Sequence, residues 1–426
     1  MSQVQLIYSL ANAENIHKAS LFSLKPGLLV FGKVEKFLQN DTAIVRVGNV
    51  RLVAHMQAAL SDADRYWFEV RSSGNEGIEL KVVEGIGEND SAQLFLKSLH
   101  LPETNRTMQL VEFFLSKNLP FSKEQLQAAA SWINPRSDSS KEFAALEWML
   151  KKDLPFTKQI FQSLMAVIEP ESFYQQLAEV NRYLDQPSFS SFKSIQELKQ
   201  LITSIINNHS INELGNGTEV KKMLKTLVQS LGLGYEKEVQ MWANGGQDSS
   251  EPISSLKPLL MRAMTELECG GKELEPILHR LTGMQLISQD PTGQVQQMVM
   301  QLPLSFGDKN SDITLQWRGR KNSKGQIDPD YCRIIFYLDL QSMNETVVDM
   351  HIQNKVIHLS VMNDTKGIES IVKAFTPKLK EKLSNIGYTL SFIKVNPFVE
   401  KNKVKQRQRN PIELSVELSQ RVDIKV

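Results

Sequence analysis

The residues best suited to catalysis or metal binding are few and widely separated in this sequence. Asp328 and Asp330 flank Pro329, and two carboxyls at that spacing could act as an acid–base pair, although the same arrangement is typical of a turn. His351 and His358 sit on neighbouring predicted strands, where a tight turn would bring the two imidazoles together. A zinc site needs further protein ligands, and none is near them in the sequence. We therefore favour a turn and a cross-strand surface pair, and predict no catalytic and no metal-binding residue.

The two cysteines and the glycine-containing stretches also fit structural roles better than chemical ones. Cys269 and Cys332 lie far apart, with no metal-spaced histidine beside either, which predicts two buried free thiols. "LGLGYE" at 231–236 follows a helical pattern, and "CGGKE" at 269–273 is typical of a turn between helices. No complete phosphate-loop, dinucleotide-binding, zinc-protease or serine-hydrolase motif occurs, so we expect no cofactor and no enzyme. Because catalytic residues need not be adjacent in sequence, an enzyme with a site between domains stays an alternative.

Length and composition favour several folded domains. The chain has 426 residues, of which 41% are hydrophobic and 23% charged, and these are ordinary values for globular proteins. The net charge of +1 provides no overall field that would attract nucleic acid or an acidic membrane. No window approaches the roughly 20 apolar residues of a membrane span, so we expect no membrane insertion.

The N-terminal segment, 1–23, does not have the pattern of a secretory signal. Its apolar stretch from Val4 to Leu10 is interrupted by Gln5 and has no basic residue before it. We therefore expect a cytoplasmic protein. Export by a type III route, which leaves no cleaved signal, stays open.

Residues 24–84 predict a small β-barrel. Five short strand-like runs are separated by turn residues, and closing them into a barrel would remove exposed strand edges. The aromatic residues Tyr66, Trp67 and Phe68 are consecutive, so they point to alternate faces and one or two belong to the core. An OB-type barrel would suggest a nucleic-acid-binding protein that uses the barrel and the basic tail, 398–426. That is our alternative to the function favoured below.

The pattern becomes helical over residues 92–290, and an internal repeat appears at 111–133 and 146–168. Leu119-Pro120-Phe121 in the first copy matches Leu154-Pro155-Phe156 in the second. Two copies are too few for a helical solenoid, so we predict a duplicated helical hairpin.

Each copy of the repeat carries its own helix signals. Pro120 and Pro155 end the preceding helix, because proline disfavours a helical conformation in the residue before it. Ser122 and Thr157 are suited to cap the next helix, and Gln125 completes a capping box in the first copy.

Residues 295–397 predict a sheet covered by one helix, in the order β-β-β-α-β. Alternating runs at 332–340, 346–352 and 356–361 predict strands, an earlier run at 313–317 alternates in the same way, and 388–395 predicts a last strand. The helix between them should begin at Asp364 as cap, be kinked or split at Pro377 and end at Gly387. We expect one of its faces, including Ile371, Phe375 and Ile386, to cover the sheet. The whole chain is thus predicted to be a multidomain α+β protein.

This C-terminal pattern resembles the C-terminal domain of the flagellar hook-length control protein family. The likeness lies in the strand Leu338-Asp339-Leu340, the corner at 341–344, the strand from Thr346 and the helix that ends at Gly387. Met343 stands where the family usually has Leu. Asn344 stands where it usually has Gly, and Asn is well able to adopt the left-handed backbone that Gly adopts.

The resemblance implies a role in protein–protein interaction. In that family the domain meets the cytosolic part of the export-gate protein of the flagellar type III secretion apparatus. The partner-binding residues would be Leu340, Met343, Asn344 and Val347; alternatively, Leu340 and Val347 belong only to the core. The long extendable segment of a hook-length ruler is missing, and the chain resembles Gram-positive relatives with a barrel and helical repeats. We therefore expect a non-enzymatic adaptor or regulator.

Overall fold

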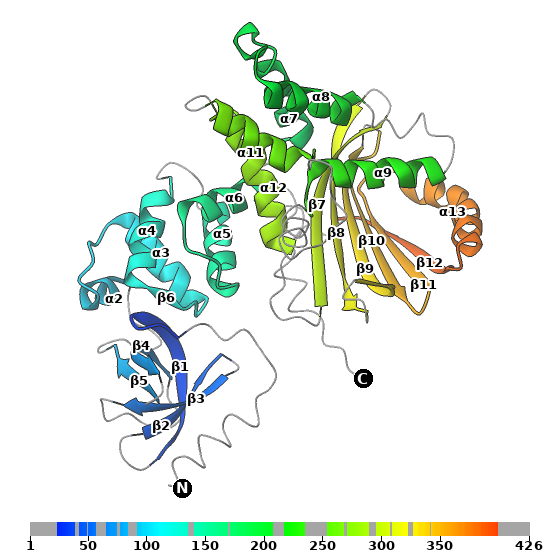
Figure 1. Ribbon diagram of the computed structural model, residues 1–426. Helices are drawn as coiled ribbons and strands as arrows, with labels where there is room; N and C mark the ends of the chain where they lie inside the picture. The colour runs from blue at the N-terminus through cyan, green and yellow to red at the C-terminus, as the bar shows by residue number, and fades with distance from the viewer. Residues whose placement is uncertain are drawn as a thin grey trace. The chain divides into compact units, whose positions relative to one another are not determined.

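The protein is seen here as a computed structural model that forms two compact units, Met1–Phe161 and Gln162–Val426 (Figure 1). The structure describes residues 24–38, 42–48, 50–56, 65–74, 77–83, 92–134, 140–168, 171–207, 217–234, 254–267, 271–288, 295–306, 309–322, 327–340 and 342–398. The N-terminal segment, Cys269 and the basic residues from 401 onward, on which several expectations rest, lie outside these ranges. Among the described helices, none is long and apolar enough to cross a membrane.

The first unit begins with the predicted β-barrel. Its strands are β1 (Leu28–Phe37), β2 (Thr42–Val47), β3 (Val50–Met56), β4 (Arg65–Gly74) and β5 (Gly77–Val82). They are hydrogen-bonded in the order β2-β3-β5-β4-β1, and β1 pairs with β2 as well as β4, which closes the barrel. Strands β3 and β5 run parallel, whereas the other barrel pairs are antiparallel.

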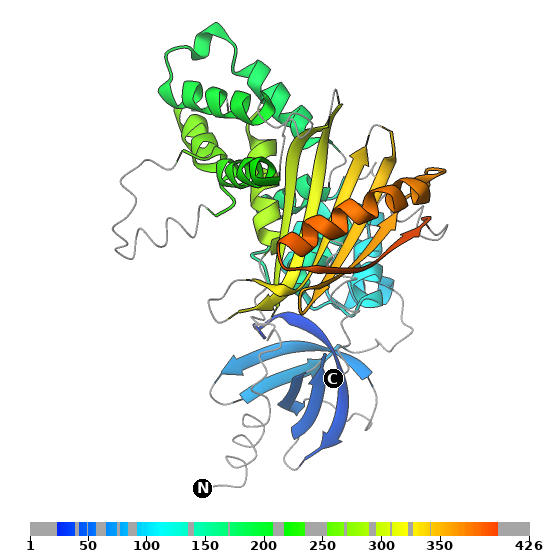
Figure 2. The ribbon, with the colours of Figure 1, turned by 90° about the vertical axis from the view of Figure 1, so that its right-hand side faces the viewer.

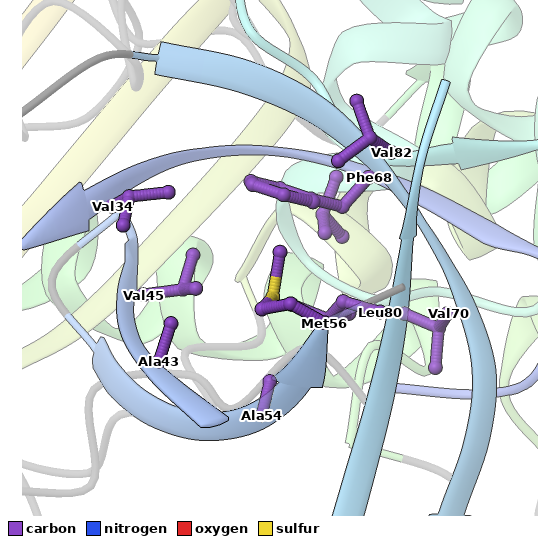
Figure 3. Packing of buried hydrophobic residues seen from close by; sticks show 10 residues of the cluster. Val34, Ala43, Val45, Ala54, Met56, Phe68, Val70, Leu80 and Val82 are labelled. Carbon is purple, nitrogen blue, oxygen red and sulfur yellow. The ribbon is translucent and has the colours of Figure 1, made fainter. Parts of the chain in front are cut away.

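Alternation along β4 separates the core of the barrel from its contact with the helices. Phe68 points inward, where it packs with Val34, Met56 and Leu80 (Figure 3). Trp67 points outward, yet it is only 3% exposed, because its ring lies against other aromatic side chains. Those rings belong to Phe31, Phe95 and Phe121, with centroids 5.4 to 5.9 Å away. The barrel and the first helices therefore share one apolar junction.

Five helices complete the described part of the first unit. They are α2 (Ala92–Ser98), α3 (Asn105–Ser116), α4 (Lys123–Trp132), α5 (Ser140–Lys151) and α6 (Lys158–Ile168), the last of which continues into the second unit. The predicted repeat corresponds to α3–α4 and α5–α6. Between α3 and α4, the short strand β6 (Phe121–Ser122) adds to the edge of β1, so the first proline turn is part of the barrel sheet.

The same turn occurs three times in this unit. Asn118 and Asp153 have left-handed backbones with φ of 51° and 48°, and each precedes a Leu-Pro pair. In both, the leucine N–H returns to the helix: Leu119 donates to the Phe114 carbonyl and Leu154 to the Met149 carbonyl, both at 3.0 Å. This is the Schellman arrangement, which satisfies carbonyls at a helix end.

The third copy was not predicted. His100, with φ of 53°, precedes Leu101-Pro102, and the Leu101 N–H donates to the Leu96 carbonyl at 3.0 Å. Histidine in place of Asn or Asp hides this copy in the sequence.

The helix caps predicted for the repeat are confirmed. The Ser122 hydroxyl accepts the Gln125 N–H at 3.2 Å, and the Gln125 side chain accepts the Ser122 N–H at 2.8 Å, which completes the capping box. Thr157 accepts the Ile160 N–H at 3.3 Å. Each proline turn therefore ends one helix and fixes the start of the next.

The second unit is built on one six-stranded sheet in the order β12-β11-β10-β9-β8-β7 (Figure 2). Its strands are β7 (Val295–Phe306), β8 (Lys309–Lys321), β9 (Ile327–Leu340), β10 (Asn344–Gln353), β11 (Val356–Met362) and β12 (Thr389–Asn396). The first five form an antiparallel meander. Helix α13 (Ile368–Asn385) then crosses one face and leads into β12, which runs parallel to β11 (Figure 2). The predicted α+β fold with a sheet-plus-helix C-terminal domain is confirmed, and β7 and the full length of β8 extend it.

A group of helices packs beside β7. They are α7 (Phe173–Tyr183), α8 (Lys193–Asn207), α9 (Gly217–Leu231), α11 (Leu256–Glu266) and α12 (Glu275–Ser288). Helix α12 covers the outer edge of β7: the Ser288 hydroxyl accepts the Val299 N–H at 2.9 Å, and the Met284 sulfur accepts the Gln301 N–H at 3.1 Å. An edge strand with unpaired N–H groups invites pairing with other chains, so α12 removes that hazard.

A buried arginine ties α12 to the end of α6 and to the segment that leads into α7. Arg280 is 1% exposed, and its guanidinium donates to the carbonyls of Ala166 at 3.1 Å and Glu171 at 2.6 Å. Beside it, the Asp312 carboxylate of β8 accepts the first N–H groups of α7, from Phe173 and Tyr174. Burial raises the pKa of Asp312, against the lowering effect of these N–H groups and of Arg280.

The start of α13 corrects one expectation. Asp364 does not cap this helix: the cap is Gly367, with φ of 84° and no side-chain hydrogen bond. The Asp364 carboxylate instead accepts the Phe398 N–H at 2.9 Å. The helix is unbroken through Pro377, and it ends at Gly387 as predicted, with φ of 85°.

The buried face of α13 is also narrower than expected. Leu379 and Leu383 pack on the sheet core, whereas Ile371, Phe375 and Ile386 are 45%, 63% and 67% exposed. The apolar stripe of α13 is therefore wider than the face of the helix that contacts the sheet.

Close packing of α12 on α6 yields a first prediction. A Cβ on Gly283 would lie 2.0 Å from the carbonyl oxygen of Ser163, so Gly283→Ala must push the two helices apart. We expect a loss of about 1–3 kcal/mol in the local free energy of opening, measured by hydrogen exchange of the α12 amides. Gly217→Ala is the matched control, because nothing lies within 4 Å of its Cβ position. Equal exchange in both variants would contradict this account of the packing.

Candidate partner-binding site

The predicted site residues meet at the corner between β9 and β10. Leu340 ends β9, Asn344 begins β10, and the two are paired in the sheet register. Asn344 has φ of 51°, so it does adopt the left-handed backbone expected of a residue in the place of glycine. The corner is therefore tight, and its two strands stay paired from there to Tyr331 and Gln353.

One buried side chain holds the corner in place. The Asn363 carboxamide, 3% exposed, points its Nδ2 at three acceptors: the carbonyls of Met343 at 2.7 Å and Glu345 at 3.0 Å, and the Thr346 hydroxyl at 2.7 Å. Its Oδ1 accepts the Thr365 N–H at 2.7 Å. Backbone carbonyls at a tight corner need hydrogen-bond donors, and the buried Asn363 side chain supplies them here.

The main chain of Asn363 adds a further link. Its N–H donates to the Asn396 carbonyl at 3.0 Å, and the Thr365 hydroxyl donates to the Met343 carbonyl at 3.1 Å. The ends of β11 and β12 are thus joined to the corner through a single residue.

An apolar floor lies beneath the corner on the sheet face opposite α13. Val347 and Phe398 are buried there with Ile335, and Tyr337 and Met362 pack against them. Phe398 follows β12 and is held by the bond from its N–H to Asp364. The chain after β12 therefore returns to the corner and supports it.

The four predicted contact residues differ in what they offer a partner. Asn344 is exposed, and Leu340 and Met343 are half-buried, so these three reach the surface. Val347 is 2% exposed, which assigns it to the floor and fits the core role that was left open for it. A partner at this corner would thus contact Leu340, Met343 and Asn344, while Val347 acts from below.

Charged groups lie beside the corner on the same face as its floor. Exposed Asp339 and Glu345 are directly paired across β9 and β10, which concentrates negative charge next to Asn344. Further along these strands, Arg333 forms a two-pronged ion pair with Asp349, at 2.9 and 2.6 Å. Such a paired guanidinium keeps a fixed geometry, so it stiffens the ladder that carries the corner.

The other candidate residues have structural roles. His351 and His358 are directly opposite across β10 and β11, as predicted. Asp328 and Asp330 lie at the start of strand β9 rather than in the turn that was expected, where the Asp328 carboxylate accepts the Asp330 N–H at 3.0 Å and the Tyr388 hydroxyl donates to Asp330 at 3.2 Å. No group of three or more His, Cys, Asp or Glu side chains that could hold a metal occurs among the residues described.

Cys332 is a buried free thiol, as expected, and burial raises its pKa. A thiol with a raised pKa is less often the reactive thiolate.

Sequence reasoning missed Asn363 and Phe398. Asn363 follows the alternating run of β11 and precedes Asp364-Thr365, a cluster that is typical of a turn. That cluster is the signal that could have drawn attention to it, but its acceptors lie 17 to 20 residues earlier, which no local pattern reveals.

Comparison with known proteins gives one distant relative. No model of a known protein family matches the sequence. Over 219 residues, the chain is 28% identical to a protein of Bacillus subtilis (strain 168) described as "Uncharacterized protein YlqG". The alignment covers 50% of this chain and 37% of that protein, so the similarity extends over well under half of the relative's length. The description of the relative assigns it no activity.

Removing the Asn363 side chain tests whether its hydrogen bonds hold the β9–β10 corner in place. Asn363→Ala leaves the Met343 and Glu345 carbonyls and the Thr346 hydroxyl without this donor, and we expect a cost of about 1–3 kcal/mol. Hydrogen exchange of the amides from Met343 to Val347 should speed up accordingly. Asn385→Ala, at the exposed end of α13, is the control and should leave the corner unchanged. Unchanged exchange of these amides in Asn363→Ala would show that the corner keeps its structure without the Asn363 side chain.

Proposed function

We propose that this protein is a non-enzymatic adaptor that binds another protein through the β9–β10 corner of its C-terminal sheet. The observation that carries the proposal is the clamped corner itself. It presents Leu340, Met343 and Asn344 at the surface, while Asn363 fixes the backbone beneath them. Binding residues are often found on loops that a rigid scaffold positions.

The rigidity of the corner favours recognition. A surface that already has its bound geometry loses little conformational entropy when a partner docks, so fewer contacts suffice for a given affinity. Half-buried Leu340 and Met343 would act as apolar anchors, and methionine adapts its shape easily to a partner.

The proposed partner is the cytosolic domain of an export-gate protein of the flagellar type III secretion apparatus. Support for this partner comes from the resemblance of the C-terminal pattern to hook-length control proteins. The Asn344 backbone conformation and the strand–corner–strand arrangement agree with the residues on which that resemblance is based. In this role the protein would act in the cytoplasm as a regulator of export.

The alternative role in nucleic-acid binding, through the barrel and the basic tail, would not use Trp67 or Phe68. Trp67 and Phe68 of the barrel are 3% and 0% exposed, so neither ring can stack on a base.

Titration calorimetry of the full-length chain with the purified cytosolic domain of the export-gate protein from the same organism tests this function. We expect saturable binding, and Met343→Asp should weaken it at least tenfold, about 1.4 kcal/mol, because a charge would replace an apolar anchor. Phe375→Asp makes the same kind of change at an exposed position of α13 and should leave the affinity unchanged.

Two results would overturn the assignment. One is the absence of binding up to about millimolar concentration, where the binding free energy is only about −4 kcal/mol. The other is an equal loss in Phe375→Asp and Met343→Asp, which would move the contact away from the corner.

A further inference from the structure

Three basic side chains form one row across neighbouring strands of the barrel. Lys33 of β1 is paired directly with Arg46 of β2 on one side and with Arg65 of β4 on the other. Directly opposed side chains of a sheet lie about 5 Å apart, and like charges in such pairs destabilise it. A row of three cations therefore works against folding unless something else compensates for it.

The row lines a cleft in the first unit. The cleft has a volume of about 380 Å³, and its opposite wall comes from the first proline turn and from α5, with Lys117, Asn118 and Lys151. Five cationic side chains thus surround it, and the described residues that line it include no Asp or Glu. The volume lies in the range of sites that hold small ligands, about 300–1,000 Å³.

Nearby carboxylates neutralise only part of this charge. Glu35 contacts Arg46 at 3.2 Å but is shared with Arg51 at 2.8 Å, and Glu147 pairs with Lys151 on α5. In the part of the chain that the structure describes, Lys33 and Lys117 form no ion pair. Arg65 also has an interaction partner, so the positive charge that the cleft keeps is mainly that of Lys33 and Lys117.

An aromatic ring lies among these cations. Phe31 is two residues from Lys33 on β1, on the same outer face, and it lines the cleft while it packs on Trp67 with centroids 5.4 Å apart. Phe31 is half-buried, so part of its ring stays accessible. Cations along a groove with an accessible ring are the combination by which proteins bind single-stranded nucleic acid. An acidic peptide would use the cations but has no need of the ring.

We propose that this cleft binds single-stranded nucleic acid. Phosphates lie along Lys33, Arg46 and Arg65 and reach Lys117 on the opposite wall, and one base lies against Phe31. The contact is made mainly to the backbone of the strand, so little sequence preference is expected. This activity belongs to the first unit and is independent of the proposed partner of the C-terminal corner.

Fluorescence anisotropy with a labelled 12-nucleotide RNA and a DNA of the same sequence tests the proposal on the full-length chain. At about 50 mM salt we expect saturable binding that weakens steeply as salt increases, because each neutralised phosphate releases counterions. Lys33→Glu with Lys117→Glu should weaken binding at least tenfold and reduce the slope of log K against log salt. Phe31→Leu should weaken binding without changing that slope.

The matched control is Lys378→Glu with Lys382→Glu on α13, which alters the net charge equally at exposed positions and should change the affinity less than twofold. Lys33→Glu removes the like-charge pairs with Arg46 and Arg65, so the melting temperature of the double variant should not fall. If it does fall, Lys33→Gln with Lys117→Gln is compared with the wild-type chain in the same way.

Three outcomes would overturn the proposal. They are the absence of binding at 50 mM salt, an equal loss of affinity in the α13 control, and competition by a 12-residue polyglutamate as strong as that by unlabelled oligonucleotide. The last result would assign the cleft to an acidic peptide.

Discussion

The C-terminal unit depends on a single buried carboxamide. The Asn363 side chain supplies hydrogen bonds to the backbone on both sides of the corner, at Met343 and Glu345, and its main chain reaches Asn396 at the end of β12. The Met343 carbonyl, which lies before the first paired residue of β10, also accepts the Thr365 hydroxyl, and a carbonyl shielded from water without a donor is costly. The corner can therefore be tight and still project Leu340 and Met343 outward. Phe398 and Val347 complete the support from below.

Elsewhere in the chain, specific hydrogen bonds likewise fix where a helix begins or ends and cover the edge of the sheet. In the first unit a left-handed residue, a Leu-Pro pair and a hydroxyl cap end one helix and start another, three times. In the second unit Asp312 caps α7 while Arg280 binds the end of α6, and α12 closes the edge of β7. Two surfaces remain that these contacts do not explain, the β9–β10 corner held by Asn363 and the basic cleft of the first unit.

Much of this architecture could be predicted from the sequence, because it depends on patterns among neighbouring residues. Strand alternation, the Ser122 capping box and the Gly387 stop depend on residues within a few positions of one another, and all three are confirmed. Long-range partners could not be predicted. Asp364 has the sequence features of a helix cap but accepts the Phe398 N–H instead. Ile371 and Phe375 belong to the apolar stripe of α13, yet they remain exposed because the sheet contacts only another part of that stripe. Likewise, the row of cations appears only once the sheet register aligns Lys33 with Arg46 and Arg65 of two later strands.

The central claim is that the β9–β10 corner is the surface that meets a partner protein. Hydrogen exchange of the full-length chain, with and without the cytosolic export-gate domain at saturating concentration, tests it most directly. The account predicts slower exchange from Leu340 to Val347 and unchanged exchange along α13 and in the barrel. Slower exchange confined to α13, around exposed Phe375 and Ile386, would contradict it and move the interface to that helix.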